Sequence, residues 1–201
     1  MGHQFFDPLS QSWRKPQVLV TLNFTCGFCG KNVAAERGYG IGMHGDGSGA
    51  LAGGVWICPS CQGPTFISPA KEQIPDVSFG DPVDSLPSDV ESLYEEARRS
   101  TSNNCYTAAV LLCRKILMHI AVEKKASENQ KFIEYVSYLA DKGYVPPDGK
   151  HWVDHIRSKG NEANHEIAVM SRDDAKDLLL FIEMLLKFVY EFPNLIKPCA
   201  S

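Results

Sequence analysis

Two pairs of cysteines, each with two residues between its members, lie in the first third of the chain: Cys26/Cys29 and Cys58/Cys61. One such pair forms a tight turn that can present two thiolates to a metal ion, and two pairs complete the four-sulfur tetrahedron usual for structural zinc. The 28 residues between the pairs exceed the commonest spacing, but a long hairpin can hold the extra length. Two disulfides, or four unrelated thiols, are the alternatives. The spacing predicts one structural Zn²⁺ bound by all four cysteines.

The sequence next to the cysteines predicts β-strands. Gln17–Phe24 is rich in β-branched and aromatic residues and leads into the first pair, and Trp56–Ile57 leads into the second. Of the seventeen residues in Gly38–Gly54, eight are glycine, which is typical of a hairpin tip. We therefore expect residues 1–67 to fold as a small β zinc ribbon.

The net charge of −4 is unevenly divided. Residues 1–70 carry four Lys/Arg and three Asp/Glu, whereas residues 71–201 carry sixteen and twenty-one. Because nucleic-acid binding needs clustered cations, any such contact must be local. The ribbon cations available for phosphate contact are Arg14, Lys15, Lys31 and Arg37. The aromatic residues that could stack on bases, or instead cover the ribbon core, are Phe24, Phe28, Tyr39 and Trp56.

Seven cysteines without an N-terminal signal sequence favour a reducing compartment. No apolar run approaches the ~18 residues that a membrane span requires. We therefore expect a soluble, cytoplasmic protein with no membrane partner.

A second, helical part follows the ribbon. Pro69, Pro75, Pro82 and Gly80 mark residues 68–86 as an extended linker. Helical periodicity then predicts helices over about 89–100, 104–125, 130–142, from about 150, and 172–192. The expected fold class is α+β: a ribbon (1–67), a linker (68–86), an all-α bundle (87–193) and a tail (194–201).

Several helix ends have recognisable signals. Ser88 with Glu91, and Ser171 with Asp174, have the spacing of capping boxes, in which two side chains satisfy orphan amide donors. Gly143 suits the position just after a helix.

The helices over 104–125 and 172–192 are apolar on nearly every side. Such helices must be buried on every side, and three partner helices do not readily provide that much cover. We therefore expect the bundle to form a homodimer. Cys105 and Cys113 are expected to be small buried residues. Arg114, charged within an apolar helix, is expected to extend toward solvent or to pair with an acid.

Four segments resemble one known family. They are Tyr94–Arg99, Ala108–Arg114, Ile156–Arg157 followed by Gly160–His165, and Asp173–Ala175 before a long apolar helix. Over roughly residues 86–193 the chain resembles the bacterial domain-of-unknown-function family 4145, of which an N-terminal zinc ribbon is a familiar companion. That family is similar to the HEPN helical superfamily, whose members are metal-independent RNases or inactive binding and dimerisation modules. The resemblance implies a HEPN-like helical bundle.

The resemblance also points to candidate catalytic residues. Active HEPN members carry an Arg followed, after four to six residues, by a His near the dimer interface, whereas here seven residues separate Arg157 from His165. In a dimer cleft Arg157 would hold a phosphate, His165 would move protons and Asn161 would orient the imidazole. Alternatively, Gly160 and Asn161 simply end a helix, and His165 forms hydrogen bonds within the bundle.

Two functions follow from these features. The preferred one is a zinc-binding bacterial module in phage defence or a stress response, whose ribbon engages nucleic acid or a partner protein and whose helical domain dimerises. The alternative is a metal-independent endoribonuclease that uses Arg157 and His165.

Overall fold

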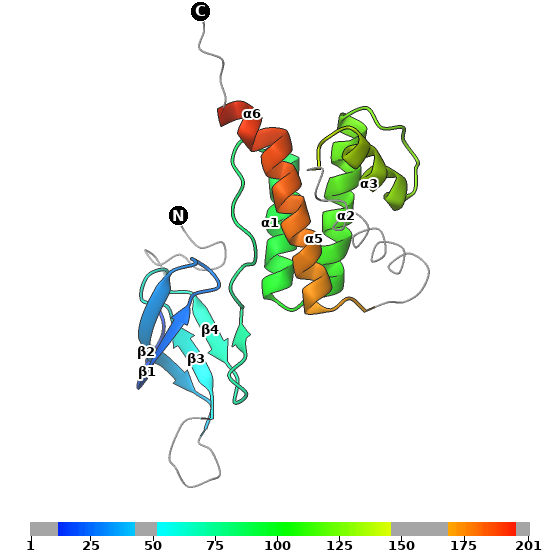
Figure 1. Cartoon of the computed structure of the whole chain (residues 1–201). Coiled ribbons are helices and arrows are strands. Elements are labelled where there is room, and N and C mark those ends of the chain that lie inside the picture. The colour runs from blue at the N-terminus through cyan, green and yellow to red at the C-terminus, as the bar shows by residue number, and fades with distance from the viewer. Residues whose placement is uncertain (1–11, 43–51, 146–168, 196–201) are drawn as a thin grey trace, which may run out of the picture. The chain divides into compact units, whose positions relative to one another are not determined.

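A computed structural model describes residues 12–42, 52–145 and 169–195. The chain divides into two compact units, residues 1–78 and residues 79–201. The first contains an antiparallel β-sheet and the second is helical (Figure 1). The α+β fold class predicted from the sequence is therefore confirmed. Among the described residues, no helix combines the length and the apolar character that a membrane span requires.

The first unit, called the ribbon from here on, is built on one five-stranded sheet. Its strands are β1 (Gln17–Thr25), β2 (Asn32–Gly40), β3 (Gly54–Ile57), β4 (Pro64–Ile67) and β5 (Gln73–Ile74). Each strand pairs antiparallel with the next, in the order β1-β2-β3-β4-β5. The strands predicted before both cysteine pairs are confirmed.

A bulge bends β1 over the rest of the sheet. Val18 lies opposite Arg37 and Leu22 opposite Ala35, so that three residues of β1 face one residue of β2. The bulge leaves the carbonyl of Val20 free to accept a hydrogen bond from the indole N–H of Trp56, at 3.1 Å. The extra residues thus let β1 curl toward β3.

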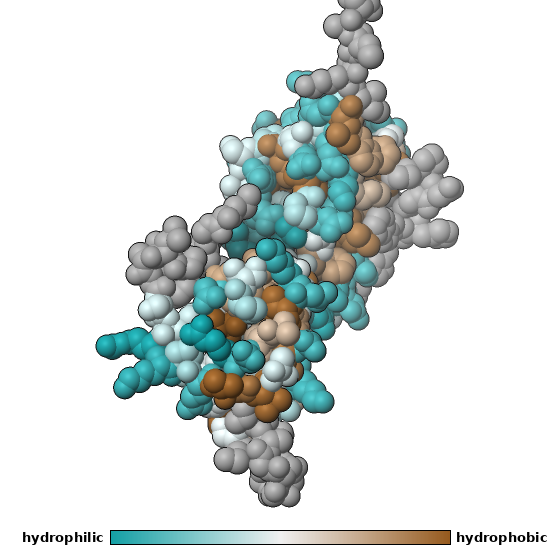
Figure 2. Space-filling model, turned by 90° about the vertical axis from the view of Figure 1, so that its left-hand side faces the viewer, coloured by the Kyte–Doolittle hydropathy of each residue, from teal (hydrophilic) through white to brown (hydrophobic). Residues whose placement is uncertain are grey.

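The apolar interior of the ribbon is small. Its buried cluster consists of Leu19, Ala35 and Trp56. Apolar side chains also remain on the surface of this unit (Figure 2), and on β1 Val18 and Val20 are 84% and 74% exposed. The sheet therefore buries too little apolar surface to be held by its core alone.

The residues expected to form a linker, 68–86, instead contribute to both units. Gln73–Ile74 forms β5, and the Gln73 side-chain amide donates to the carbonyl of Thr25 at 2.8 Å. Residues 79–81 are fixed on the helical unit by four hydrogen bonds, one of them from Arg98 to the Phe79 carbonyl (3.3 Å). Arg98 donates to the Gly80 carbonyl (2.7 Å), the Tyr94 hydroxyl donates to the Asp81 carbonyl (2.9 Å), and Glu183 accepts from the Asp81 N–H (2.9 Å). Prolines and glycine prevent helix here, but they do not prevent tertiary hydrogen bonds.

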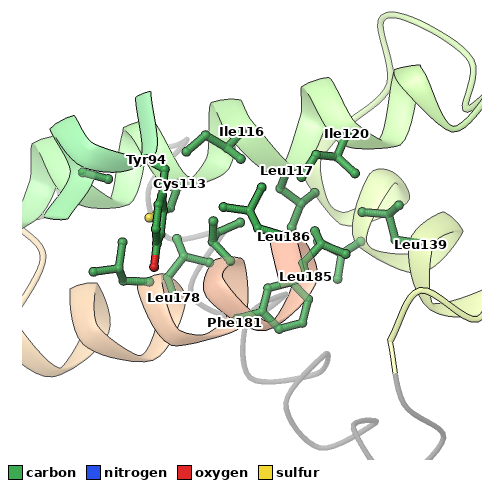
Figure 3. Close-up of a cluster of buried hydrophobic side chains, with 14 of the residues drawn as sticks. Tyr94, Cys113, Ile116, Leu117, Ile120, Leu139, Leu178, Phe181, Leu185 and Leu186 are labelled. Atoms are coloured by element: carbon green, nitrogen blue, oxygen red, sulfur yellow. The ribbon is translucent and has the colours of Figure 1, made fainter. Parts of the chain in front are cut away.

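The helical unit contains α1 (Ser88–Ser102), α2 (Tyr106–Glu123), α3 (Phe132–Asp141) and α5 (Arg172–Leu186). A π-helical turn, η2 (Lys187–Glu191), and the short α6 (Phe192–Leu195) continue α5. Side chains of α1, α2 and α5 point toward one another in a common core (Figure 3). Its fully buried members include Tyr94, Leu117, Ile120, Phe181 and Leu186. The helix expected from about residue 150 lies outside the described residues.

Two predicted helix ends are confirmed and two are wrong. The Ser171 hydroxyl accepts from the Asp174 N–H at 3.1 Å and the Asp174 carboxylate accepts from the Ser171 N–H at 3.0 Å. Gly143 follows α3 with a φ of +77°. The prediction of a capping box at Ser88 is wrong, because α1 already includes Ser88. The N-cap is Pro87, whose carbonyl accepts a hydrogen bond from the Glu91 N–H. The last helix also continues past Pro193, where it was expected to end.

Burial corrects one further expectation and one of the two alternatives of another. Cys113 is fully buried as predicted, but Cys105 is exposed because it precedes α2 and lies in the turn after α1. Arg114 is only 6% exposed, and its guanidinium lies 4.5 Å from the ring centroid of Phe132. It therefore packs on an aromatic face rather than extending into solvent, and burial lowers its pKa.

The core of the helical unit can be tested with two leucines on α2. Leu117 is 0% exposed and Leu111 is 53% exposed. We expect Leu117→Ala to lower the free energy of unfolding by about 2–5 kcal/mol, because it leaves a cavity. Leu111→Ala should change it by about 0.5 kcal/mol or less. Urea unfolding followed by helical circular dichroism measures both, and equal losses in the two variants would contradict the assigned core.

Candidate metal centre

Two turns of equivalent geometry carry the four predicted metal ligands. Cys26–Cys29 joins β1 to β2, and Cys58–Cys61 joins β3 to β4. In the first turn the carbonyl of Cys26 accepts from the N–H four residues later (2.8 Å), and its own N–H donates to the carbonyl five residues later (2.9 Å). Cys58 makes the same two hydrogen bonds, at 2.9 Å each.

Both turns also need the same backbone conformation. The residue after the second cysteine has a positive φ, +67° at Gly30 and +62° at Gln62. This left-handed conformation reverses the chain, so that both cysteines of a pair face the same side. Since β1–β2 and β3–β4 are parts of one antiparallel sheet, the two turns lie at the same end of it.

The four sulfur atoms fit one tetrahedral metal ion. All four lie within 4.8 Å of one another. The Cys26 and Cys61 Sγ atoms are 3.7 Å apart, and those of Cys29 and Cys58 are 3.9 Å apart. A tetrahedron with Zn–S bonds of about 2.3 Å has S–S edges of about 3.8 Å. A disulfide would need an S–S distance of about 2.05 Å, so the disulfide alternative is wrong and the cysteines are free.

The surroundings of the sulfurs contain amide donors. Burial raises the pKa of Cys26 and of Cys61, since a buried thiolate is poorly solvated. At Cys29 burial also acts to raise the pKa, but hydrogen bonds, chiefly from the backbone N–H of Lys31, outweigh it and lower the pKa. The N–H of Gly63 donates to Cys61 Sγ at 3.4 Å. Such donors stabilise negative sulfur in a metal-bound state.

A second layer of residues supports the turns, and sequence reasoning missed it. A Cβ on Gly27 would lie 2.4 Å from the carbonyl oxygen of Pro75, so only glycine lets the segment after β5 pack on the first turn. A Cβ on Gly63 would lie 2.6 Å from the ring of Phe28. The glycines beside the cysteines were the available signal, but the partner residues are distant in sequence.

The indole of Trp13 supports the second turn and orders the chain before β1. Its N–H donates to the carbonyl of Gln62 at 2.9 Å, and the centroid of its ring lies 6.4 Å from the ring centroid of Tyr39. The Tyr39 hydroxyl in turn donates to the carbonyl of Arg14 at 2.6 Å. These contacts fix the backbone that carries Arg14 and Lys15.

The four candidate cations of the ribbon are all exposed, but they do not form one group. Arg37 pairs with Val18 in the sheet, near the start of β1 and therefore near Arg14 and Lys15. Lys31 follows the first cysteine turn, at the other end of β1. Of the candidate stacking residues, Trp56 is buried, whereas Phe24, Phe28 and Tyr39 are half-buried.

The candidate catalytic residues Arg157, Asn161 and His165 lie outside the described residues, and their proposed roles stay predictions.

Comparison with known proteins concerns the helical part. The model of the family described as a domain of unknown function (DUF4145) matches residues 95–198. The chain belongs to the DUF4145 family. The match begins within α1 and leaves the cysteine cluster outside it. No curated protein and no solved structure matches the chain. The predicted resemblance to DUF4145 is confirmed.

Metal content tests the site directly. We expect about one zinc ion per chain in the purified protein and much less in Cys58→Ser, because three sulfurs cannot close the tetrahedral shell. Cys105→Ser is the matched control, since Cys105 is an exposed cysteine outside the cluster. Elemental analysis of both variants after dialysis measures this. Equal zinc loss in the two variants would show that Cys58 is not a specific ligand.

Proposed function

We propose that this protein is a zinc-dependent binding module: Zn²⁺ holds the ribbon, the ribbon engages a partner protein, and the helical unit brings two copies together. The four-sulfur cluster is the observation that carries the proposal. Four cysteines fill all four positions around a tetrahedral zinc ion and leave none open for substrate or water. The role of the metal in this proposal is therefore structural.

A surface stripe on the last helix supports the proposed dimer. Leu180, Phe188, Phe192 and Leu195 are 42%, 42%, 40% and 71% exposed, and the half-buried Met184 lies between the first two. Spacings of three and four residues place them on successive turns of one side. A contiguous apolar surface of this kind marks an interaction site in soluble proteins. We propose that it pairs with the same stripe of a second copy in a HEPN-like bacterial dimer.

Charge and exposure favour a protein as the ribbon's partner. Residues 1–78 contain five Lys/Arg and five Asp/Glu, a formal charge of zero. Four thiolates around one Zn²⁺ would add a charge of −2. The ribbon has no excess of positive charge, but it exposes large apolar side chains: Val18, Val20 and Ile41 are 84%, 74% and 51% exposed. Apolar exposure without excess positive charge suits a protein surface better than a phosphate backbone.

One local feature favours nucleic acid as a second candidate partner. Arg14, Lys15 and Arg37 are exposed near the paired rings of Trp13 and Tyr39. Cations beside aromatic rings are the usual combination in proteins that bind single strands.

The dimer is tested by removing the stripe. We expect the wild-type protein to have the mass of two chains and the double variant Phe188→Ser/Phe192→Ser the mass of one, because the apolar contact is lost. Leu111→Ser is the matched control, since it removes an apolar side chain that is 53% exposed on α2. Size-exclusion chromatography with light scattering measures the masses. A monomeric wild-type protein, or a double variant that stays dimeric, would contradict the proposed interface.

The nucleic-acid candidate is tested by salt dependence. If three cations contact phosphates, affinity for the single strand dT20 should fall about 20-fold between 50 and 200 mM salt. Arg37→Ala should weaken binding and reduce this dependence, whereas Lys115→Ala, which removes an exposed cation of α2, should do neither. Fluorescence anisotropy measures both. Absent binding, or affinity unchanged by salt, would remove nucleic acid from consideration.

A further inference from the structure

A groove of about 480 Å³ lies in the ribbon, away from the cysteines. One wall is formed by Val20–Phe24 of β1, and the other by Ser68, Pro69 and Lys71, between β4 and β5, and by Gln73 of β5. Trp56 and Ile67 also line it. The groove thus runs between the curled strand β1 and the far side of the sheet. Its volume is in the range that holds a bound ligand or a few side chains.

The groove is the open side of the small ribbon core. Leu22, Phe24 and Ile67 pack on the buried cluster but remain half-buried, and all three line the groove. A cluster whose buried members, in the described part of the ribbon, are three residues gains much from additional apolar cover. The groove therefore offers apolar contact to an incoming side chain.

The neighbouring edge of the sheet is unusual. β1 is a nine-residue edge strand that contains no charged residue, proline or glycine. Edge strands of soluble proteins normally carry such residues, because unpaired N–H and C=O groups attract other strands. Within the described ranges, no strand pairs with the outer edge of β1. The carbonyls of Val20 and Thr25 already accept hydrogen bonds from Trp56 and Gln73. An extended segment can add to the rest of this edge by backbone hydrogen bonds, which is a common way to bind a peptide.

The groove also has a charge preference. Among the described residues that line it, Lys71 is the charged one, and the polar side chains around it, Thr21, Asn23, Ser68 and Gln73, are neutral. Lys71 is exposed and stands on the wall opposite β1. A segment that lies along β1 with an acidic residue facing Lys71 would complement this charge. One cation and a buried Trp56 face do not suit a nucleic-acid strand.

We propose that the groove and the free edge of β1 bind an extended acidic–apolar segment of a partner protein. An apolar side chain of the segment occupies the groove against Leu22, Phe24 and Ile67, and an acidic side chain pairs with Lys71. This inference rests on the proposed function of the ribbon in binding a protein, and it names the class of partner and the surface.

The test uses a phage-displayed library of random linear twelve-residue peptides, panned against the zinc-loaded full-length protein. We expect enriched peptides to alternate apolar residues and to contain an acidic residue. Binding of synthetic copies should weaken at least three-fold in Lys71→Glu, and the same peptides with lysine in place of the acid should bind Lys71→Glu better than wild type. Lys31→Glu is the matched control, since Lys31 is exposed on the same unit but does not line the groove.

The site of binding is measured by amide chemical shifts of the labelled full-length chain. Shifts at residues 18–24 and 68–73 support the proposal. No enrichment, enrichment that Lys71→Glu and Lys31→Glu reduce equally, or shifts elsewhere would overturn it. If no peptide binds while zinc content and dimer mass are as proposed, only the proposed binding role of the groove is wrong. If the protein lacks zinc or is a monomer, the proposed function itself fails.

Discussion

The four cysteine sulfurs at one end of the sheet are the constraint on which the ribbon depends. They join the β1–β2 turn to the β3–β4 turn at sulfur separations that match the edge of a zinc tetrahedron. Among the described residues, the apolar cluster of this unit has three buried members, which supply less stability than a larger domain draws from its core. A bound metal would supply that stability, because its binding free energy becomes folding free energy.

In the proposed function, a metal bound at the cysteines would hold the turns and leave the rest of the ribbon free to serve in binding. β1 can keep an uncharged edge and exposed valines, and the core can stay open at the groove, because neither is needed to hold the turns together. The helical unit is different, since its core buries large side chains from α1, α2, α3 and α5. The exposed apolar stripe of this unit is not part of the buried core. This is the physical reason why we propose that it binds a second copy of the chain.

The sequence predicted those features that depend on short-range spacing. The Cys-x2-Cys pairs, the strand before each pair and the Ser171–Asp174 capping box are each read within a few residues, and the structure confirms them. Features that depend on distant residues were missed. The β5 strand forms only because β4 lies beside it, and Arg98 donates to the carbonyls of Phe79 and Gly80. Local proline and glycine content could not reveal these partners.

X-ray absorption at the zinc edge measures the ligand shell of the metal. We expect a single shell of four sulfur atoms at about 2.3 Å from the metal in the purified protein. A shell containing nitrogen or oxygen ligands, or protein that is folded, free of metal and holds all four thiols reduced, would contradict it.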